Sequence, residues 1–186
     1  MAAVRLRGIL PDFGDSVAVH WRGFPLLPHH LPGNRVSPCS VQGRARAAEA
    51  ESACGITPWS GDGYPTSSLP ALEAARCAAR QCAEAFDGFD MALFRAFFSE
   101  SRDISDRDVL LGLADGVGLD TRRLAWDMQS GVERQALLEE YHVARDEYSS
   151  MALGIPFTVI NGSYPLTGAL PADMYRHAVQ RALSEN

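Results

Sequence analysis

Four cysteines give this chain the option of thiol chemistry, which is the first chemistry that its residues could perform. A thiolate attacks disulfides and binds metals, and it forms most readily beside a cation or at a helix N-terminus. Cys39 follows Ser37-Pro38 at the predicted start of a helix. We interpret Cys39 as the best candidate for a reactive thiol, because the helix dipole would stabilise its thiolate there.

Cys77 and Cys82 are five residues apart on a predicted helix. That spacing places the two side chains ~140° apart around the helix axis and their Cα atoms more than ~7 Å apart. Such a separation is beyond comfortable reach of a disulfide bond. We therefore predict two buried helical thiols. The sequence contains no Cys-x-x-Cys pair, so no catalytic residue is assigned.

Metal ligands are the second option for these residue types. His29 and His30 lie near Cys39 and Cys54 in the sequence. Adjacent histidines and a widely spaced cysteine pair match none of the usual zinc spacings. The chain also lacks a glycine-rich loop in the context that would cradle a phosphate. We predict no metal site and no bound cofactor.

Composition narrows the class of partner. The chain has 186 residues, which favours one domain, and its net charge of -6 argues against a nucleic-acid or anionic-membrane partner. No apolar run approaches the ~18 residues that a membrane span needs. The N-terminus lacks the apolar core and small-residue cleavage site of a signal peptide. We expect a cytoplasmic protein.

Helices are predicted between two patches of strand. Residues 17–21 alternate apolar with small or polar side chains and predict a strand. Periodicity, capping residues and glycines predict helices over 2–10, 41–53, 69–83, 89–98, 105–117, 120–130 and 130–154. Five phenylalanines within this part could line a ligand pocket, but their helical spacing favours packing between the helical block and the sheet: Phe86, Phe89, Phe94, Phe97 and Phe98.

The run 154–169, GIPFTVINGSYPLTGA, predicts a β-hairpin. Pro156 must open its first strand, because proline cannot donate to a sheet ladder. Asn161-Gly162 between two apolar runs is the strongest short-range hairpin signal. An amphipathic stretch over 171–183 closes the unit.

Three segments together carry a family resemblance: Trp21-Arg22-Gly23-Phe24-Pro25-Leu26, the stretch 92–104 and the hairpin block that begins at Ile155-Pro156. In this order they resemble the DsbA family, in its cytoplasmic FrnE-like branch. The resemblance implies an α/β fold with a thioredoxin-like (DsbA-like) sheet and an inserted helical domain. Its domains would be 1–66 with 155–186, and the helical insertion 67–154.

The resemblance also implies a function. Family members are thiol-disulfide oxidoreductases or isomerases that act on protein or small-molecule disulfides through mixed disulfides. Ile155, Pro156 and Phe157 would form the substrate-binding surface, with a cis peptide bond at Pro156. No cofactor is implied, although glutathione could serve as a thiol substrate, and a homodimer is left open.

The chain departs from the family at its N-terminus. Family members begin with a strand and a Cys-x-x-Cys pair at a helix start, whereas residues 1–6 resemble the helix after that motif. About 20 N-terminal residues of a family member are therefore expected to be missing. They would include the strand that lies, in a thioredoxin-like sheet, between the strand at 17–21 and the strand that begins at Phe157. Three explanations stay open: a start codon assigned too late, which we favour, a rebuilt or swapped structure, or a degenerate non-enzymatic descendant. As written, the chain is predicted to be inactive, and whether it is an enzyme stays open.

Two alternatives remain. One is a glutathione-dependent isomerase or transferase of the kappa-like branch, of the 2-hydroxychromene-2-carboxylate isomerase type, in which a serine replaces the nucleophilic cysteine. The other is a non-catalytic module that binds peptides by strand addition at the hairpin edge.

Overall fold

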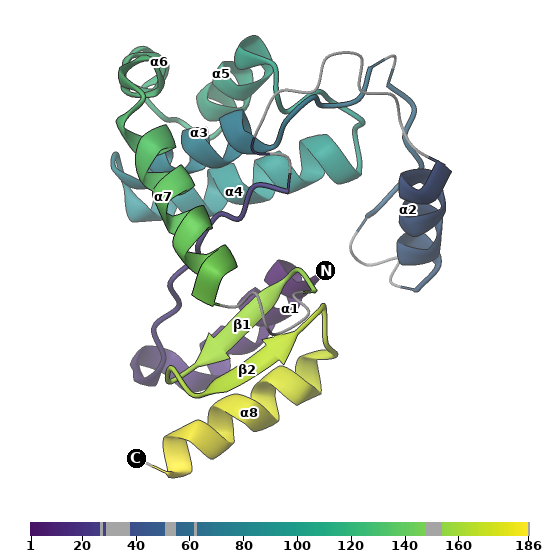
Figure 1. Ribbon diagram of the computed structural model, residues 1–186, viewed down its shortest axis with the longest axis vertical. Helices are drawn as coiled ribbons and strands as arrows, with labels where there is room; N and C mark the ends of the chain where they lie inside the picture. The colour runs from purple at the N-terminus through teal and green to yellow at the C-terminus, as the bar shows by residue number, and fades with distance from the viewer. Residues whose placement is uncertain (27, 29–37, 51–54, 62, 148–153, 186) are drawn as a thin grey trace. The chain divides into compact units, whose positions relative to one another are not determined.

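The computed structural model describes residues 1–26, 28, 38–50, 55–61, 63–147 and 154–185. The chain divides into two compact units, each described here by itself. The hairpin unit comprises Met1–Trp21 and Ala144–Asn186, and the helical unit comprises Arg22–Val143. The elements in chain order are α1 (Ala2–Ile9), the 3-10 helix η1 (Leu10–Ser16), α2 (Pro38–Ala50), α3 (Leu69–Ala79), α4 (Ala83–Phe98), α5 (Arg107–Gly116), α6 (Thr121–Ser130), α7 (Val132–Glu147), β1 (Phe157–Ile160), β2 (Tyr164–Thr167) and α8 (Ala172–Ser184), as Figure 1 shows.

Local turn chemistry forms the hairpin, as predicted. β1 and β2 are antiparallel, with Phe157 opposite Thr167 and Ile160 opposite Tyr164. The amide of Ser163 donates to the carbonyl oxygen of Ile160 at 3.1 Å. Asn161 and Gly162 have φ values of 48° and 68°. Positive φ at both central residues is what a type I′ turn requires, and the strand twist of hairpins favours that turn.

One face of the hairpin packs against α1 and α8, and α8 runs along β2 (Figure 1). Tyr175 of α8 is fully buried, together with Ala2 and Ile9 of α1. Arg5 of α1 reaches the loop before α8, where it donates to the carbonyl oxygens of Ala169 and Leu170 at 2.7 and 2.8 Å. The first and last helices of the chain therefore position the hairpin.

The predicted strand over 17–21 is wrong. The described part of the chain contains one sheet, formed by β1 and β2, and residues 17–21 are not in it. Val17 has an extended backbone, with φ -131° and ψ 125°. Extended residues become a strand only where a neighbouring strand supplies hydrogen bonds, and no described segment does so here. Trp21 instead lies under the guanidinium of Arg7, 4.5 Å from the ring centroid.

The helical unit has one core, formed by α3, α4, α5 and α6. Its fully buried members include Ala74, Cys77, Phe89, Leu110 and Leu124. Phe86 packs against this same core, and Phe89 lies within it. No described helix of the chain is both long and apolar enough to cross a membrane.

The capping residues differ slightly from those predicted. The side chain of Asp106, rather than Ser105, caps α5 by accepting from the amides of Asp108 and Val109. Asp120 caps α6 as predicted, and Gly131 ends that helix in the left-handed conformation, with φ 71°.

The helix predicted through Cys77 and Cys82 is broken. α3 ends at Ala79 and α4 begins at Ala83, so Cys82 is the N-cap of α4. A side chain holds the break in place. The amide of Gln81 donates to the carbonyl oxygen of Asp120 at 3.1 Å and accepts from the Asp120 amide at 3.0 Å. This exchange joins the break to the start of α6, which no helical periodicity could have indicated.

Candidate functional site

The start of β1 carries the predicted substrate-binding residues. The peptide bond between Ile155 and Pro156 is cis. Ile155 is 45% exposed, and Phe157, the first residue of β1, is half-buried opposite Thr167. The structure therefore places Ile155, Pro156 and Phe157 together at one end of the hairpin.

Pro156 faces Gly168 across the hairpin. The amide of Gly168 donates to the Pro156 carbonyl oxygen at 2.8 Å. In an antiparallel ladder the partner would return this hydrogen bond, but proline has no N–H to donate. The hydroxyl of Tyr175 takes its place by donating to the Gly168 carbonyl oxygen at 3.0 Å. The amide of Leu170 also donates to this oxygen, at 3.1 Å, so Tyr175 and Leu170 together replace the hydrogen bond that Pro156 cannot make.

Ile155 keeps its backbone groups uncommitted. Neither its N–H nor its C=O bonds to any residue within the described ranges. The chain just before it comes close to β2, where a Cβ on Gly154 would lie 2.9 Å from Cγ2 of Thr167. Only glycine fits there without displacing a neighbour. Ile155 therefore presents a side chain, a donor and an acceptor at the surface of the hairpin unit.

No cysteine belongs to the hairpin unit, because all four lie between residues 22 and 143. Cys39 is the second residue of α2 in the helical unit, so its backbone lies in the first turn of a helix. Its side chain and Cys54 lie outside what the structure describes. The hairpin unit, which carries Ile155, therefore has no thiol of its own.

Cys77 is fully buried, as predicted. Burial raises the pKa of its thiol to about 12, and the carboxylates of Glu73, Asp127 and Glu133 act in the same direction. At neutral pH this thiol is therefore protonated and out of reach of solvent. Such a cysteine is inert toward disulfides.

Cys82 is exposed, so the prediction of a buried helical thiol is wrong for this residue. The cause is the break after α3, which puts Cys82 at the surface as the N-cap of α4. Its Sγ donates to the carboxylate of Glu84 at 2.8 Å, and this hydrogen bond lowers the pKa of Glu84. An acidic residue in the first turn is typical of a helix start. Glu84 is therefore the signal by which the sequence could have placed a helix start at Cys82.

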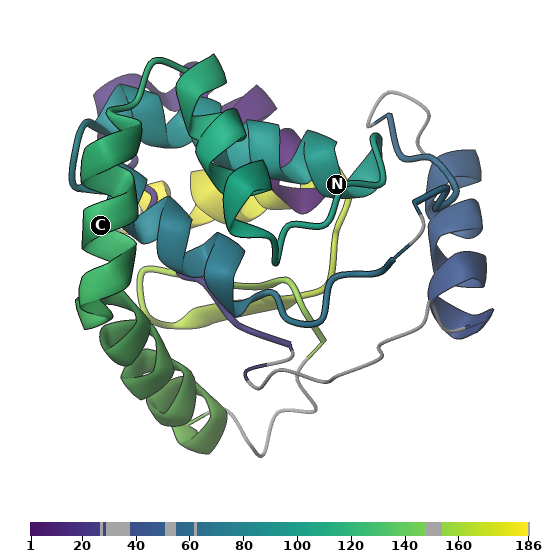
Figure 2. The same ribbon diagram turned by 90° about the horizontal axis from the view of Figure 1, so that it is seen from above.

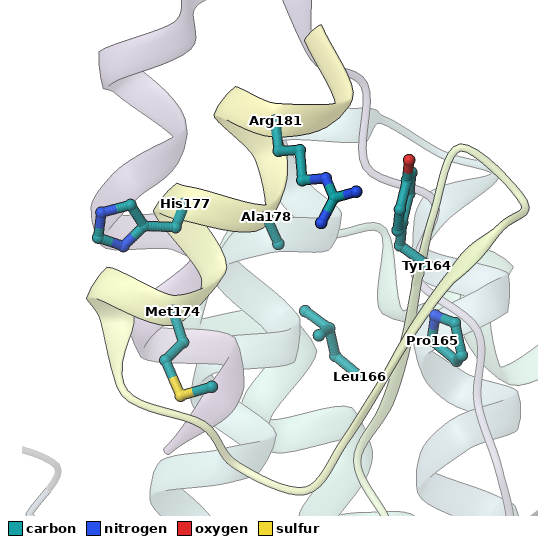
Figure 3. Close-up of a pocket in the computed structure, with 7 residues that line it drawn as sticks. All are labelled: Tyr164, Pro165, Leu166, Met174, His177, Ala178 and Arg181. Carbon is teal, nitrogen blue, oxygen red and sulfur yellow. The ribbon is translucent and has the colours of Figure 1, made fainter. Parts of the chain in front are cut away.

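A pocket of about 480 Å³, which no sequence motif indicates, opens between β2 and α8. Figure 3 shows Leu166 and Ala178 at its middle, with Arg181 and Tyr164 pointing toward each other at one end. Both of these side chains hydrogen-bond to Glu185, whose pKa they lower. At the polar end of the pocket, Tyr164 and Arg181 therefore already have a hydrogen-bond partner in Glu185. The rest of the lining is Pro165, Met174 and His177.

Among the described residues no group of histidine, cysteine, aspartate or glutamate side chains has the arrangement of a metal site. His29, His30 and Cys54 lie outside the described ranges.

Comparison with solved structures shows the fold. The chain is similar to a protein from Streptomyces coelicolor described as a probable DsbA oxidoreductase, with 21% identity and a TM-score of 0.76 over 100% of this chain and 84% of the other. It is also similar to a protein from Nitrosomonas europaea described as a "putative protein disulfide isomerase", with 19% identity and a TM-score of 0.73 over 99% of this chain and 90% of the other. Both matches confirm the predicted DsbA-like thioredoxin fold.

No curated protein matches the chain in a sequence search. The sequence model of the DSBA-like thioredoxin domain matches residues 1–180. The match includes the hairpin, the helical unit and most of α8. This protein therefore belongs to the DSBA-like thioredoxin domain family.

Proposed function

We propose that this protein binds extended peptide segments, including those of disulfide-containing proteins, at the start of β1. We further propose that the cysteines of this sequence do not perform thiol-disulfide exchange. The observation that carries the proposal is the backbone of Ile155, whose N–H and C=O have no partner in the described parts of the chain.

Strand addition explains why such a backbone would bind peptides. An extended segment gains affinity from main-chain hydrogen bonds and specificity from the side chains beside them. Ile155 offers one donor, one acceptor and an apolar side chain that is 45% exposed. Gly154 and the hydrogen bonds of Pro156 and Tyr175 fix the backbone on either side, so little ordering would be needed on binding.

Thiol-disulfide exchange requires an attacking thiolate and a second thiol that resolves the mixed disulfide. The sequence contains no Cys-x-x-Cys pair. Cys77 is buried with a pKa of about 12, and Cys82 is exposed on a different element. These features support a binding role for the chain as written. A cysteine pair supplied from outside this sequence would make the same surface the substrate platform of an oxidoreductase of the FrnE-like branch.

Peptide binding is the first half of the test. Fluorescein-labelled, S-alkylated insulin B chain serves as an extended probe, and fluorescence anisotropy measures its affinity. Ile155→Pro removes the N–H and should weaken binding about fivefold to tenfold, as expected for one lost hydrogen bond. Ile155→Ala keeps the N–H and shortens the side chain, so it measures the contribution of the side chain, and the Ile155→Pro variant should bind more weakly than Ile155→Ala. Equal affinities of the Ile155→Pro variant and the unmodified protein would contradict the proposed site.

Turnover is the second half. Reduction of insulin by dithiothreitol is followed by turbidity, with the unmodified protein and with a variant in which all four cysteines are replaced. We expect no acceleration by either protein and the same peptide affinity for both. Acceleration that disappears in the cysteine-free variant would instead establish redox catalysis. The kappa-like alternative predicts saturable glutathione binding, which calorimetry of the same samples measures.

A further inference from the structure

Arg44 is a buried cation on α2. Its side chain is only 5% exposed, and among the α2 residues whose side chains are described it alone is buried. Burying a charge is costly unless nearby groups compensate it. The surroundings of Arg44 therefore have to be arranged for a cation.

Aromatic rings surround the guanidinium. Its central carbon lies 5.1 Å from the ring centroid of Phe97, 5.2 Å from Trp59 and 5.6 Å from Phe98. Tyr64 packs against Trp59 and Phe97, with ring centroids 4.8 and 5.6 Å apart. Faces of aromatic rings attract cations through the ring quadrupole, and rings in this arrangement recognise organic cations in other proteins. We call these four residues the aromatic cage.

Carbonyl oxygens complete the cage. Nε of Arg44 donates to Thr57 at 3.1 Å, and Nη2 donates to Phe97 and Phe98 at 3.0 and 2.8 Å. Phe97 and Phe98 are the last residues of α4, whose C-terminal carbonyls form the negative end of the helix dipole. This end of the helix favours a cation, and the three carbonyl acceptors suit a guanidinium, which has several N–H donors.

Among the described residues no carboxylate forms an ion pair with Arg44. Burial lowers the pKa of its guanidinium, and Tyr64 is the neighbour that acts in the opposite direction. Nη1 is buried and has no hydrogen-bond partner within the described ranges. In the described part of the chain, ring faces and carbonyl oxygens are therefore the groups that balance the charge. Both kinds of group also stabilise a cation that is not part of the chain.

Among the α2 residues whose side chains are described, Arg44 makes the hydrogen bonds to the rest of the helical unit. Its exposed residues include Gln42, Gly43, Arg46 and Glu49. In both views α2 stands apart from the other helices of the helical unit (Figures 1 and 2). A helix of 13 residues with an internal glycine is marginally stable by itself. We therefore expect the contacts of Arg44 to contribute to the attachment of α2 to the helical unit.

We propose that the aromatic cage with the carbonyl oxygens of Thr57, Phe97 and Phe98 is a guanidinium-binding site, which Arg44 fills as a built-in ligand. When α2 moves away, the site accepts a guanidinium group from outside the helical unit. The group is either the side chain of an arginine in a peptide or a small guanidinium compound. The inference is independent of the peptide site at Ile155.

The Arg44→Ala variant tests the proposal by opening the cage. Ethylguanidinium is titrated into this variant while the indole N–H resonances of the three tryptophans and the melting temperature are followed. We expect a saturable shift of the Trp59 resonance and a rise in melting temperature. The unmodified protein should bind at least tenfold more weakly, because its own arginine occupies the site. Arg46→Ala, on the exposed side of the same helix, is the matched control and should behave like the unmodified protein.

Two further probes separate the contribution of the planar shape from that of the positive charge. Urea has the planar shape without the charge, and tetramethylammonium has the charge without donors, so neither should replace ethylguanidinium. If Arg44→Ala does not fold, ethylguanidinium should restore its circular dichroism spectrum. Absence of both binding and rescue would overturn the proposal, as would an equal response of Arg46→Ala. Acetyl-arginine amide that binds more tightly than ethylguanidinium would assign the site to peptides, and the reverse order to small compounds.

Discussion

The hydroxyl of Tyr175 lies 3.0 Å from the carbonyl oxygen of Gly168 and donates a hydrogen bond to it. The same hydroxyl accepts from the amide of Leu170 at 3.3 Å. Pro156, which faces Gly168 across the hairpin, cannot make the first of these bonds. A buried side chain from α8 therefore stabilises the backbone that carries the proposed peptide site.

Tyr175→Phe should destabilise the protein by about 0.5–1.5 kcal/mol, because it removes one hydrogen-bond partner from the Gly168 carbonyl oxygen and one from the Leu170 amide, which still bond to each other at 3.1 Å. Urea unfolding measures the change in the free energy of unfolding. Tyr164→Phe is the control: its hydroxyl is exposed and hydrogen-bonds to the exposed side chain of Glu185, so we expect a loss below ~0.5 kcal/mol. Equal effects of the two variants would argue against the special role of Tyr175.

Gly154→Ala should cost about 1–3 kcal/mol of stability, since its new Cβ would overlap Cγ2 of Thr167. Thr167→Ser removes that methyl group and should recover most of the loss in the double variant. Thermal unfolding of the two single variants and the double variant gives the coupling between the sites. Additive effects would show that the clash is not the cause.

Cys77 should make stability fall as the solution becomes alkaline. Its folded-state pKa is about 12, above the value of the unfolded thiol. The contribution is fully present below the unfolded pKa and is lost as pH rises toward 12, at no more than about 1.4 kcal/mol per pH unit. Urea unfolding between pH 8 and about 11 in the Cys77→Ala variant should show a shallower slope than in the unmodified protein. A slope unchanged by the substitution would contradict this.

Glu73 and Arg134 form an ion pair in which the glutamate is fully buried and the arginine is half exposed. The Glu73 side chain has no exposed surface, and Arg134 donates to one of its oxygens at 2.8 and 2.9 Å while the other oxygen has no partner in the described ranges. Burial raises the pKa of Glu73. Removing the arginine alone leaves a buried charge, so Arg134→Met should cost about 3–5 kcal/mol at neutral pH.

Glu73→Gln is the variant to compare with Arg134→Met, because it removes the buried charge. We expect it to change the free energy of unfolding little. Stability from the protonated Glu73 carboxyl is present below its ordinary pKa and is lost as pH rises through the raised one. Arg134→Met should therefore recover stability on acidification, and the double variant should not. Chemical unfolding at a series of acidic pH values distinguishes the two. The idea fails if the two variants respond alike to acid.

Sequence reasoning predicted best where the cause is local. Asn161-Gly162 sets the hairpin turn through its own φ angles, and Asp120 caps α6 through the next residues along the chain. The same reasoning failed at residues 17–21, because extended residues need a partner strand that the local sequence does not supply. It also failed at Cys82, where the exchange between Gln81 and Asp120 ends one helix and exposes the thiol.

By itself, the sequence determined the hairpin, the helical block and the family, since turn residues, periodicity and matched segments are all encoded in order along the chain. Only the tertiary structure decided three contacts: the hydrogen bond from Tyr175 to Gly168, the close approach of Gly154 to Thr167, and the position of Arg44 in the aromatic cage. The physical reason is that each of these contacts joins groups separated along the chain. Its energy depends on burial and distance, which only the folded chain defines.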